Sequence, residues 1–350
     1  MASGEDDYVG VKSEKRKVRD LRYYSLKEHN TFGIDAKCAR FLEYATDEEA
    51  REVAAILHSE DTPYIIIGGG SNLLLTQDYE GIVVHSACKG IEREGNYLVC
   101  GSGEVWDDVV AESIRMGLYG AENLSLIPGD VGASAVQNIG AYGAEAKDLI
   151  RRIRVVEIAT GDIRVIEHTA CEYGYRQSRF KHDWKNQYLI LSVAYEFSEV
   201  FEPRLDYGNI RAELEKAGIT QPSAQELRDT IIRIREAKLP DPKVLGNAGS
   251  FFMNPIVARS KYNELASQYD GMPHYDVDAD SVKIPAGWMI DQCGWKGKSL
   301  GRAGVHDKQA LVLVNRGGAT GAEMVALCKA IQEDVRATFG IDIYPEVNII

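Results

Sequence analysis

Hydrophobic residues recur along the chain both at helical spacing and in short β-rich runs. Residues 47–58 (DEEAREVAAILH) place apolar side chains at helical spacing behind an acidic first turn. Because helices and strands follow each other in no regular order, the pattern predicts an α+β fold. Further helices are predicted at residues 105–116, 224–236 and 322–339, and strands or short extended runs at residues 64–67, 73–75, 81–85, 97–100, 153–158, 163–166, 189–197 and 310–314.

Length and charge limit the classes of protein to consider. With 350 residues, of which 45% are hydrophobic, the chain is long enough for two or three domains. Its formal net charge of −13 argues against a general nucleic-acid binder, although a few local cations can still bind a small anionic ligand. No apolar run reaches the roughly 18 residues of a membrane-spanning helix.

The N-terminus and the cysteines indicate a cytoplasmic location. The first residues read MASGEDD, without the basic and apolar regions of a signal peptide. The six cysteines are scattered and show no zinc-ligand spacing, so we expect reduced thiols and no metal site. Residues 1–20 are charged and lack apolar periodicity, which predicts a disordered tail without a role in chemistry.

Two glycine-rich segments are candidates for binding a dinucleotide. Residues 68–72 (GGGSN) follow a predicted strand, where glycines let backbone N–H groups approach a pyrophosphate. They are not the GxGxxG fingerprint, and an ordinary tight turn explains them equally well. Residues 126–134 (LIPGDVGAS) and 137–143 (QNIGAYG) combine small residues with two amides that can bond a heteroaromatic ring edge. A loop-rich connector is the alternative interpretation of these residues.

A few polar side chains are candidates for catalysis or ligand binding. Ser250 lies between glycine and two phenylalanines and could donate a proton, although most serines in such turns bond their own backbone. Arg176 could stabilise an oxyanion or bind a carboxylate, or form an exposed ion pair. Glu346 lies in an alternating apolar stretch. The sequence does not decide whether its side chain faces solvent or a site. Residues 238–243 (KLPDPK) form a rigid basic segment that could hold a diphosphate or be solvated.

These segments recur together in one known family. Their ordered set, which runs from about residue 24 to the C-terminus, closely resembles the UDP-N-acetylenolpyruvoylglucosamine reductases. The set comprises NTFGID (30–35), GGGSN (68–72), IPG (127–129), QNIGAYG (137–143), YR (175–176), KLPDPK (238–243), GNAGSFF (246–252), AGWMIDQ (286–292) and PEV (345–347). Residues 205–208 (LDYG) resemble the substrate tyrosine loop of the family's type I branch.

The resemblance implies a fold of three domains. Two of them form an FAD-binding unit of the vanillyl-alcohol-oxidase type, with residues 21–86 plus 340–350 as the first subdomain and residues 87–228 as the second. Residues 229–339 are then the substrate-binding domain, which closes over the substrate.

The resemblance also implies an activity. NADPH reduces bound FAD, and the reduced cofactor reduces UDP-N-acetylglucosamine enolpyruvate to UDP-N-acetylmuramate, a precursor of peptidoglycan. We expect a cytoplasmic monomer that acts on no membrane or nucleic acid. Two alternatives remain open: an FAD-dependent alcohol oxidase of the same fold, and a nucleotide-binding module without catalysis.

Residue roles follow from the same resemblance. Ser250 is the expected general acid, and Arg176 and Glu346 are expected to stabilise the intermediate. A departure at Gly69, where relatives can carry an acidic residue, leaves backbone contacts to FAD unaffected. The expected substrate-binding residues are Tyr207, Lys238, Asn254 and Gln309. The expected FAD contacts are Gly68, Gly69, Gly70, Ser71, Asn72, Pro128, Gly129, Gly132, Ala133, Ser134, Gln137, Asn138, Gly140, Ala141 and Tyr142.

Overall fold

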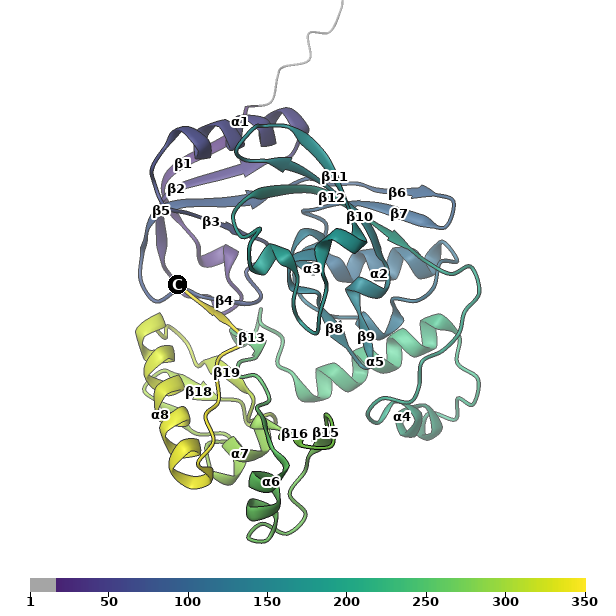
Figure 1. Ribbon diagram of the computed structural model, residues 1–350, viewed down its shortest axis with the longest axis vertical. Coiled ribbons are helices and arrows are strands. Elements are labelled where there is room, and N and C mark those ends of the chain that lie inside the picture. Colours follow the sequence, from purple (N-terminus) through teal and green to yellow (C-terminus); the bar gives the residue numbers. More distant parts are fainter. Residues whose placement is uncertain (1–16) are drawn as a thin grey trace, which may run out of the picture.

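The computed structural model describes residues 17–350 and arranges helices and sheets in three units. Two larger sheets occupy the upper half of Figure 1, and the C-terminal helices with smaller sheets occupy the lower half. Every helix and strand predicted from the hydrophobic pattern is present, with ends that differ by a few residues at most. The α+β fold class is therefore confirmed.

The first unit is a four-stranded sheet with one long helix. Its outer strand is antiparallel to its neighbour, and the other pairs are parallel. The helix, α1 (Asp47–Ser59), begins after Thr46, whose side chain accepts a hydrogen bond from the backbone N–H of Glu49. In spatial order the strands are β1 (Arg19–Ser25), β2 (Lys37–Tyr44), β5 (Tyr79–Ser86) and β3 (Tyr64–Ile67).

Strand β1 shortens the expected N-terminal tail. The tail predicted over residues 1–20 is too long at its C-terminal end, because β1 begins at Arg19, which pairs with Glu43. Asp20 is in the same strand and accepts two hydrogen bonds from the buried guanidinium of Arg40. Residues 1–16 of the predicted tail lie outside the described residues.

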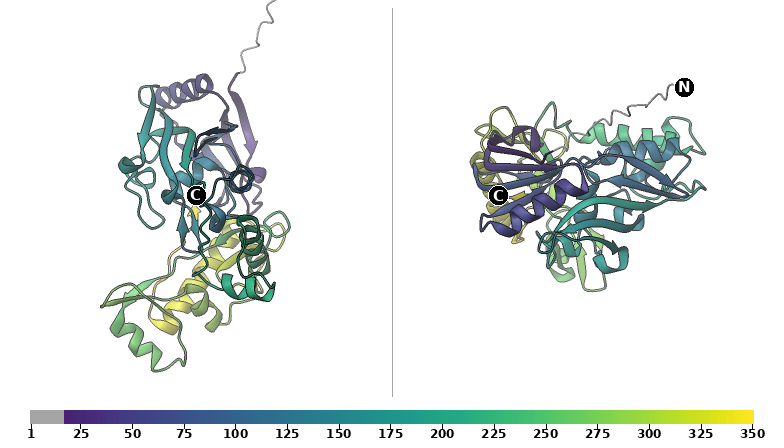
Figure 2. Two further views of the ribbon diagram at one scale, coloured as in Figure 1. Left: turned by 90° about the vertical axis from the view of Figure 1, so that its right-hand side faces the viewer. Right: turned by 90° about the horizontal axis from the view of Figure 1, so that it is seen from above.

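The second unit is an antiparallel five-stranded sheet, and α1 connects it with the first. Apolar residues of α1 pack against β2 and β5 of the first sheet and against two strands of the second, which closes a core between the sheets (Figure 2). Helices α2 (Trp106–Arg115) and α3 (Val131–Gln137) cover the second sheet through a separate core. The strand order is β11 (Ile163–Glu167), β10 (Ile150–Glu157), β12 (Tyr188–Glu196), β7 (Tyr97–Gly101) and β6 (Ile91–Glu94).

The third unit packs helices against two small antiparallel sheets. Helix α8 (Gly321–Phe339) is its longest element and ends at Gly340, whose φ of 63° suits a glycine C-cap. The other helices are α6 (Arg259–Ala266) and α7 (Ala286–Gln292). One sheet has the order β13 (Asn247–Ser250), β19 (Val312–Asn315), β18 (Ala303–Val305) and β17 (Ser299–Leu300), and the other β14 (Ile256–Ala258), β16 (Ser281–Lys283) and β15 (Tyr275–Asp276).

Helix α5 (Ala224–Lys238) connects the second unit with the third. It packs with α4 (Ile210–Lys216), and its Arg228 donates two hydrogen bonds, of 2.6 and 2.9 Å, to the carboxylate of Asp107 in α2. The domain boundary expected between residues 228 and 229 falls within this helix. A division after Lys238 keeps α5 whole and leaves it with the second unit.

The first and third units share one hydrophobic core. Phe32 and Phe251 belong to this core, with ring centroids 6.2 Å apart. The amide of Asn315 donates a hydrogen bond to the carbonyl of Phe32, and a side chain at Gly246 would collide with that carbonyl. Near the C-terminus, β20 (Asn348–Ile349) pairs in parallel with β4 (Leu73–Leu74) of the first unit. These contacts fix the third unit against the first.

Candidate active site

The two glycine-rich segments lie against each other. The Ser71 hydroxyl donates a 3.1 Å hydrogen bond to the carbonyl of Pro128 and lies 2.9 Å from the position of a Cβ at Gly129. Gly70 has a φ of 63°, and a Cβ there would lie 2.0 Å from the carbonyl oxygen of His29. Only glycine is compatible with this turn. Residues 68–72 are called the first loop below, and residues 128–132 the second loop.

Backbone groups of the first loop are available for a ligand. Within the described residues, no backbone N–H of residues 68–72 donates a hydrogen bond to another backbone group. Gly68 also faces Ala133, since a Cβ at residue 68 would lie 3.1 Å from the Cβ of Ala133. A row of free N–H groups suits an anionic group such as the diphosphate of FAD.

The carboxylate of Asp130 fills the space beside two glycines of the first loop. Its Oδ1 lies 3.2 Å from the position of a Cβ at Gly69, and its Oδ2 lies 3.4 Å from that of Gly68. A side chain at residue 69 would therefore compete with Asp130 for this space. Residue 69 carries no acidic side chain in this protein. The carboxylate of Asp130, from the second loop, lies in that place instead.

Residues 126–143 contain a helix that the sequence interpretation as a loop missed. Helix α3 ends at Asn138, which has a φ of 45°. Its Ser134 donates to the carbonyl of Val131 and bonds the hydroxyl of Tyr195, while the Asn138 amide donates to the carbonyl of Gly174. Both side chains are buried. They therefore support the site from behind, and their contact with a cofactor would be through the backbone.

Segments far apart in the sequence bring Ser250, Arg176 and Glu346 together. Ser250 ends β13 with an exposed side chain, and the next residue, Phe251, accepts a 2.8 Å hydrogen bond from the backbone N–H of Glu346. The Glu346 carboxylate then lies 3.8 Å from Nε of Arg176. An acid and a cation thus meet beside the strand that ends at Ser250, where the second and third units come together.

Arg176 is held in an unusual backbone conformation. Its φ is 56°, which a non-glycine residue adopts only with support from its surroundings. Nζ of Lys181 donates a 2.9 Å hydrogen bond to the Arg176 carbonyl, and the guanidinium donates to the carbonyl of Gly140 in β8 (Gly140–Ala141), which pairs with β9 (Ala144–Glu145). Burial lowers the pKa of Lys181, and the charge of Glu346 opposes this effect.

Exposed tyrosines surround the same region. Tyr207 packs edge-on against Tyr142, with ring centroids 6.3 Å apart. Burial and the neighbouring Tyr275 and Tyr175 raise the pKa of Tyr207. Nζ of Lys283 lies 4.6 Å from the ring centroid of Tyr175. Sequence reasoning assigned no site role to Tyr175, Tyr275 or Lys283, since each looks like an ordinary surface residue until the units are assembled.

The other predicted substrate residues differ in their surroundings. The side chain of Asn254 accepts a 2.9 Å hydrogen bond from the N–H of Ala286, at the start of α7. Gln309 approaches the same helix, with Oε1 3.3 Å from the position of a Cβ at Gly287. Lys238 ends α5 with an exposed side chain that makes no hydrogen bond within the described residues. Asn254 and Gln309 thus both lie at the start of α7, and among the described residues Lys238 makes no hydrogen bond or ion pair with either.

Arg235 is a candidate site residue to which nothing in the sequence pointed. It lies in α5, and its Nε is a buried donor without a hydrogen-bond partner in the described part of the chain. Burial lowers its pKa and the charge of Arg176 adds to this effect, whereas Tyr142 and Asp107 oppose it. A half-buried arginine with a buried, unpaired Nε donor is suited to an anion. In the sequence it cannot be told from the other arginines of the helix.

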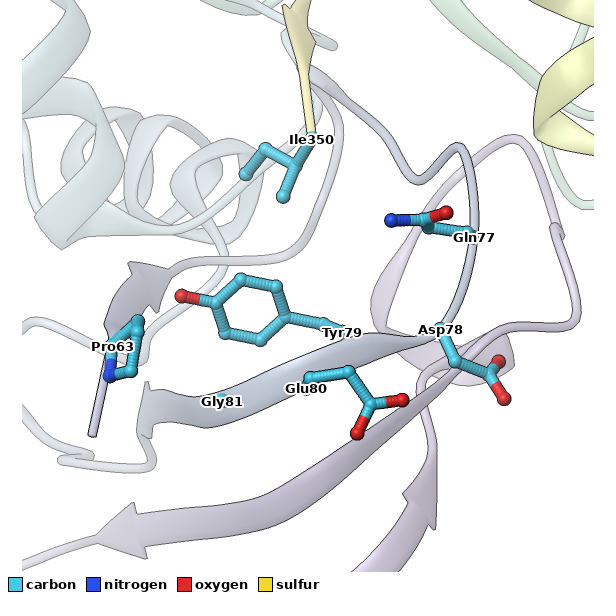
Figure 3. A pocket seen from close by; sticks show the side chains of 7 residues that line it. All are labelled: Pro63, Gln77, Asp78, Tyr79, Glu80, Gly81 and Ile350. Carbon is cyan, nitrogen blue, oxygen red and sulfur yellow. The ribbon is translucent and has the colours of Figure 1, made fainter.

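One pocket is lined entirely by residues outside this region. It has a volume of about 310 Å³, and the ring of Tyr79 stands between Pro63 and Ile350 (Figure 3). Its other lining residues, Gln77, Asp78, Glu80 and Gly81, include no expected site residue. The described residues also contain no His, Cys, Asp and Glu cluster that could hold a metal ion, and no helix in residues 17–350 is long and apolar enough to cross a membrane.

Comparison with known proteins gives a consistent result along the chain. Residues 241–350 match the family described as UDP-N-acetylenolpyruvoylglucosamine reductase, C-terminal domain, and residues 39–167 match the FAD binding domain family. The UDP-N-acetylenolpyruvoylglucosamine reductase of Bacteroides fragilis strain YCH46 is 55% identical over 333 residues, which cover 93% of this chain and 99% of that protein.

More distant relatives agree. The enzyme of the same name from Porphyromonas gingivalis strain W83 is 46% identical, over 95% of this chain and 99% of the relative, and that from Paraburkholderia xenovorans is 44% identical over the same shares. The crystal structure of UDP-N-acetylenolpyruvylglucosamine reductase from Thermus caldophilus matches with a TM-score of 0.67 over 95% of this chain and 98% of the other. At 21% identity this last match shows a shared fold.

Proposed function

The chain belongs to the family of UDP-N-acetylenolpyruvoylglucosamine reductases, and from this premise we propose how its residues carry out the reaction. The protein is an FAD-binding oxidoreductase of peptidoglycan precursor synthesis that uses NADPH to reduce UDP-N-acetylglucosamine enolpyruvate. The observation that carries the assignment of roles is the meeting of Arg176 and Glu346 beside the strand that ends at Ser250.

The first and second units form the FAD-binding unit of the vanillyl-alcohol-oxidase type. We assign the cofactor to the two loops for two reasons. A Cβ at their glycines would narrow the space beside the loops, and the first-loop N–H groups are free. When bound, FAD takes a hydride from NADPH and supplies it to the substrate. Gly68 to Asn72 and Pro128 to Ala133 would hold its anionic part through backbone groups.

Arg176, Glu346 and Ser250 act on the enolpyruvyl group. Hydride addition to the β-carbon of the enol ether builds negative charge on the α-carbon and its carboxylate. The guanidinium of Arg176 is fixed by its hydrogen bond to the carbonyl of Gly140, and Lys181 holds the backbone carbonyl of Arg176, so the positive charge stabilises that negative charge without rearrangement. Glu346 contributes through a hydrogen bond, and Ser250 gives a proton to the α-carbon to complete the lactyl ether.

The remaining substrate contacts divide between the units. We propose that Tyr207 covers the substrate from the second unit, while Asn254 and Gln309 bind it near the start of α7. Lys238 would reach the anionic part of the sugar nucleotide from the end of α5. Arg235, whose buried Nε is an unpaired donor in the described part of the chain, is a further cation available to an anion at this site.

We propose that the enzyme works as a cytoplasmic monomer. Its six cysteines are free thiols, as expected in a reducing compartment. Size-exclusion chromatography with light scattering tests the oligomeric state directly.

The function is tested by anaerobic visible spectroscopy of the purified protein. Flavin absorption that bleaches with NADPH and returns with the enolpyruvyl sugar nucleotide supports the reductase. Absorption that returns only after oxygen is admitted favours the alcohol oxidase alternative, and a protein that takes up no FAD contradicts the cofactor assignment.

A further inference from the structure

A chain of four charged side chains runs from the edge of the first sheet to the first loop. Arg19 in β1 donates a 3.1 Å hydrogen bond to Glu43 in β2. The other carboxylate oxygen of Glu43 lies 2.9 Å from Nδ1 of His85 in β5, and Nε2 of His85 lies 3.6 Å from Oδ2 of Asp130. The chain therefore ends at the carboxylate that packs against Gly68 and Gly69.

The inner three members of this chain are largely shielded from water. The side chains of Glu43, His85 and Asp130 are 17%, 16% and 14% exposed. The aromatic ring of Phe41 stacks beside His85, and His29 packs edge-on against it at 5.2 Å. Interactions between charges are weakly screened in such surroundings, so each carboxylate depends strongly on the histidine between them.

The position of Asp130 poses an electrostatic problem for an anionic ligand. Asp130 precedes α3 but its side chain makes no capping hydrogen bond to that helix. It lies instead against the backbone whose free N–H groups suit a diphosphate. An uncompensated carboxylate there would repel the phosphate groups, because like charges disfavour each other's charged forms at short range.

We propose that His85 is a positioning residue for FAD: as a cation between Glu43 and Asp130, it holds the Asp130 carboxylate against the first loop and neutralises it beside the cofactor diphosphate. The inference rests on the proposed placement of FAD at the two loops. With His85 charged, Arg19, Glu43, His85 and Asp130 sum to zero. Without that charge, the group nearest the loop carries a net negative charge.

The other groups that face His85 are consistent with this role. Burial lowers the pKa of His85, but the carboxylates of Asp130 and Glu43 outweigh burial and raise it to about 9. The hydrogen bond from His85 is the main cause that lowers the pKa of Glu43 to about 2. His29 responds in the opposite sense, since burial and then the charge of His85 lower its pKa. The surroundings thus favour the charged form of His85 and the neutral form of His29.

The test is a double-mutant cycle on the full chain stripped of flavin, titrated with FAD at neutral pH by the quenching of flavin fluorescence. We expect His85→Gln to weaken FAD binding by about tenfold or more, whereas Asp130→Asn leaves it at least as tight as in the wild type. The double variant should bind like Asp130→Asn alone, because no carboxylate then needs neutralising. A merely structural role of His85 would instead leave the double variant as weak as His85→Gln.

Several outcomes overturn the proposal. They are an unchanged FAD affinity in His85→Gln, or a double variant that binds as weakly as His85→Gln. Should His85→Gln fail to fold, Asp130→Asn is titrated with FAD as the pH rises through 9. Its affinity should fall less than that of the wild type, and an equally steep fall contradicts the role of His85. Wild-type protein that binds no FAD would overturn the cofactor site itself, which separates the two failures.

Discussion

Arg176 and Glu346 face each other across the junction of the second and third units, with 3.8 Å between Nε and Oε1. Neither position is set by its own neighbours in sequence alone. Arg176 needs the carbonyl of Gly140 and the ammonium of Lys181, and Glu346 needs the strand pairing with Phe251. The roles proposed for Arg176 and Glu346 therefore depend on contacts that form only when the units are assembled.

Ser250→Ala should separate the two half-reactions. Ser250 has no assigned role in the reduction of FAD by NADPH, so flavin bleaching should keep its wild-type rate. Product formation should fall by about 10²- to 10⁴-fold, the usual contribution of a positioned proton donor. Stopped-flow absorbance and product chromatography measure the two steps. Equal losses in both would remove Ser250 from the role of general acid.

Arg176→Lys keeps a positive charge but loses the planar guanidinium that reaches Gly140 and Glu346. We expect kcat to fall by about 10²- to 10³-fold, as for other fixed groups that stabilise developing charge. Arg179→Lys is the matched control, since Arg179 forms an exposed ion pair with Asp183 a short distance along the chain. If steady-state assays show the same kcat for both variants, Arg176 does not stabilise the intermediate.

Tyr207→Phe tests the substrate contact of the second unit. The ring packing against Tyr142 survives this change, whereas the hydroxyl is lost. Substrate affinity should fall by about tenfold, the cost of one hydrogen bond to a polar ligand. Flavin reduction by NADPH should be unaffected. Isothermal titration of the oxidised enzyme with substrate gives the affinity, and a wild-type value would place Tyr207 outside the site.

The Arg228–Asp107 pair should contribute to stability rather than chemistry. Arg228→Met leaves the half-buried Asp107 without its cation and should lower the free energy of unfolding by about 3–5 kcal/mol. Arg115→Met, which removes an exposed pair with Glu112, should leave the unfolding transition unchanged. Denaturant titrations compare the two variants, and similar midpoints would show that the buried pair is dispensable.

The pH dependence of that pair has a defined sign. Burial raises the pKa of Asp107, but Arg228 and the N–H of Leu126 together lower it below the ordinary 3.8. Its stabilising effect is therefore present above about pH 4 and lost as the pH falls through the lowered pKa. The difference in stability between wild type and Arg228→Met should shrink at acid pH.

The contribution of His85 to stability should depend on pH in the opposite sense. Its pKa is raised from 6.5 to about 9 on folding, so its contribution is fully present below pH 6.5 and is lost as the pH rises through about 9. The contribution is on the order of 3 kcal/mol, from the linkage between pKa and stability. Unfolding free energies of wild type and His85→Gln at pH 6 and pH 9.5 measure it. A difference between the two proteins that stays constant with pH would show that folding does not raise the pKa of His85.

The sequence predicted the longest helices and missed strands β1 and β2 as well as helix α3. Helix α1 was visible because Val53 and Leu57 lie at helical spacing and are buried. Helix α3 was not, because its buried residues include Ser134 and Ala135 rather than large apolar side chains. Strand β1 is exposed along most of its length, so no alternation of buried and exposed positions marks it as a strand.

The site was predictable as a set of residues but not as a geometry. The resemblance named Ser250, Arg176 and Glu346, and their roles remain predictions. Nothing in the spacing of residues showed that Asp130 would fill the space beside Gly69, or that His85 would stand behind it. Arg235 stayed hidden for a related reason, since burial of one arginine in a charged helix is decided by tertiary packing.

The core that contains both Phe32 and Phe251 bears on how such enzymes diverge by recombination. An exchange of the third unit between two relatives would combine core side chains from both parents in one shared core. Side chains whose volumes do not match lower the stability of a densely packed core. The carbonyl of Phe32 leaves no room for a side chain at Gly246 and accepts a hydrogen bond from Asn315, so this interface tolerates even less change. Viable chimeras should therefore inherit the N-terminal sheet and the C-terminal unit from one parent, with crossovers tolerated around the second sheet.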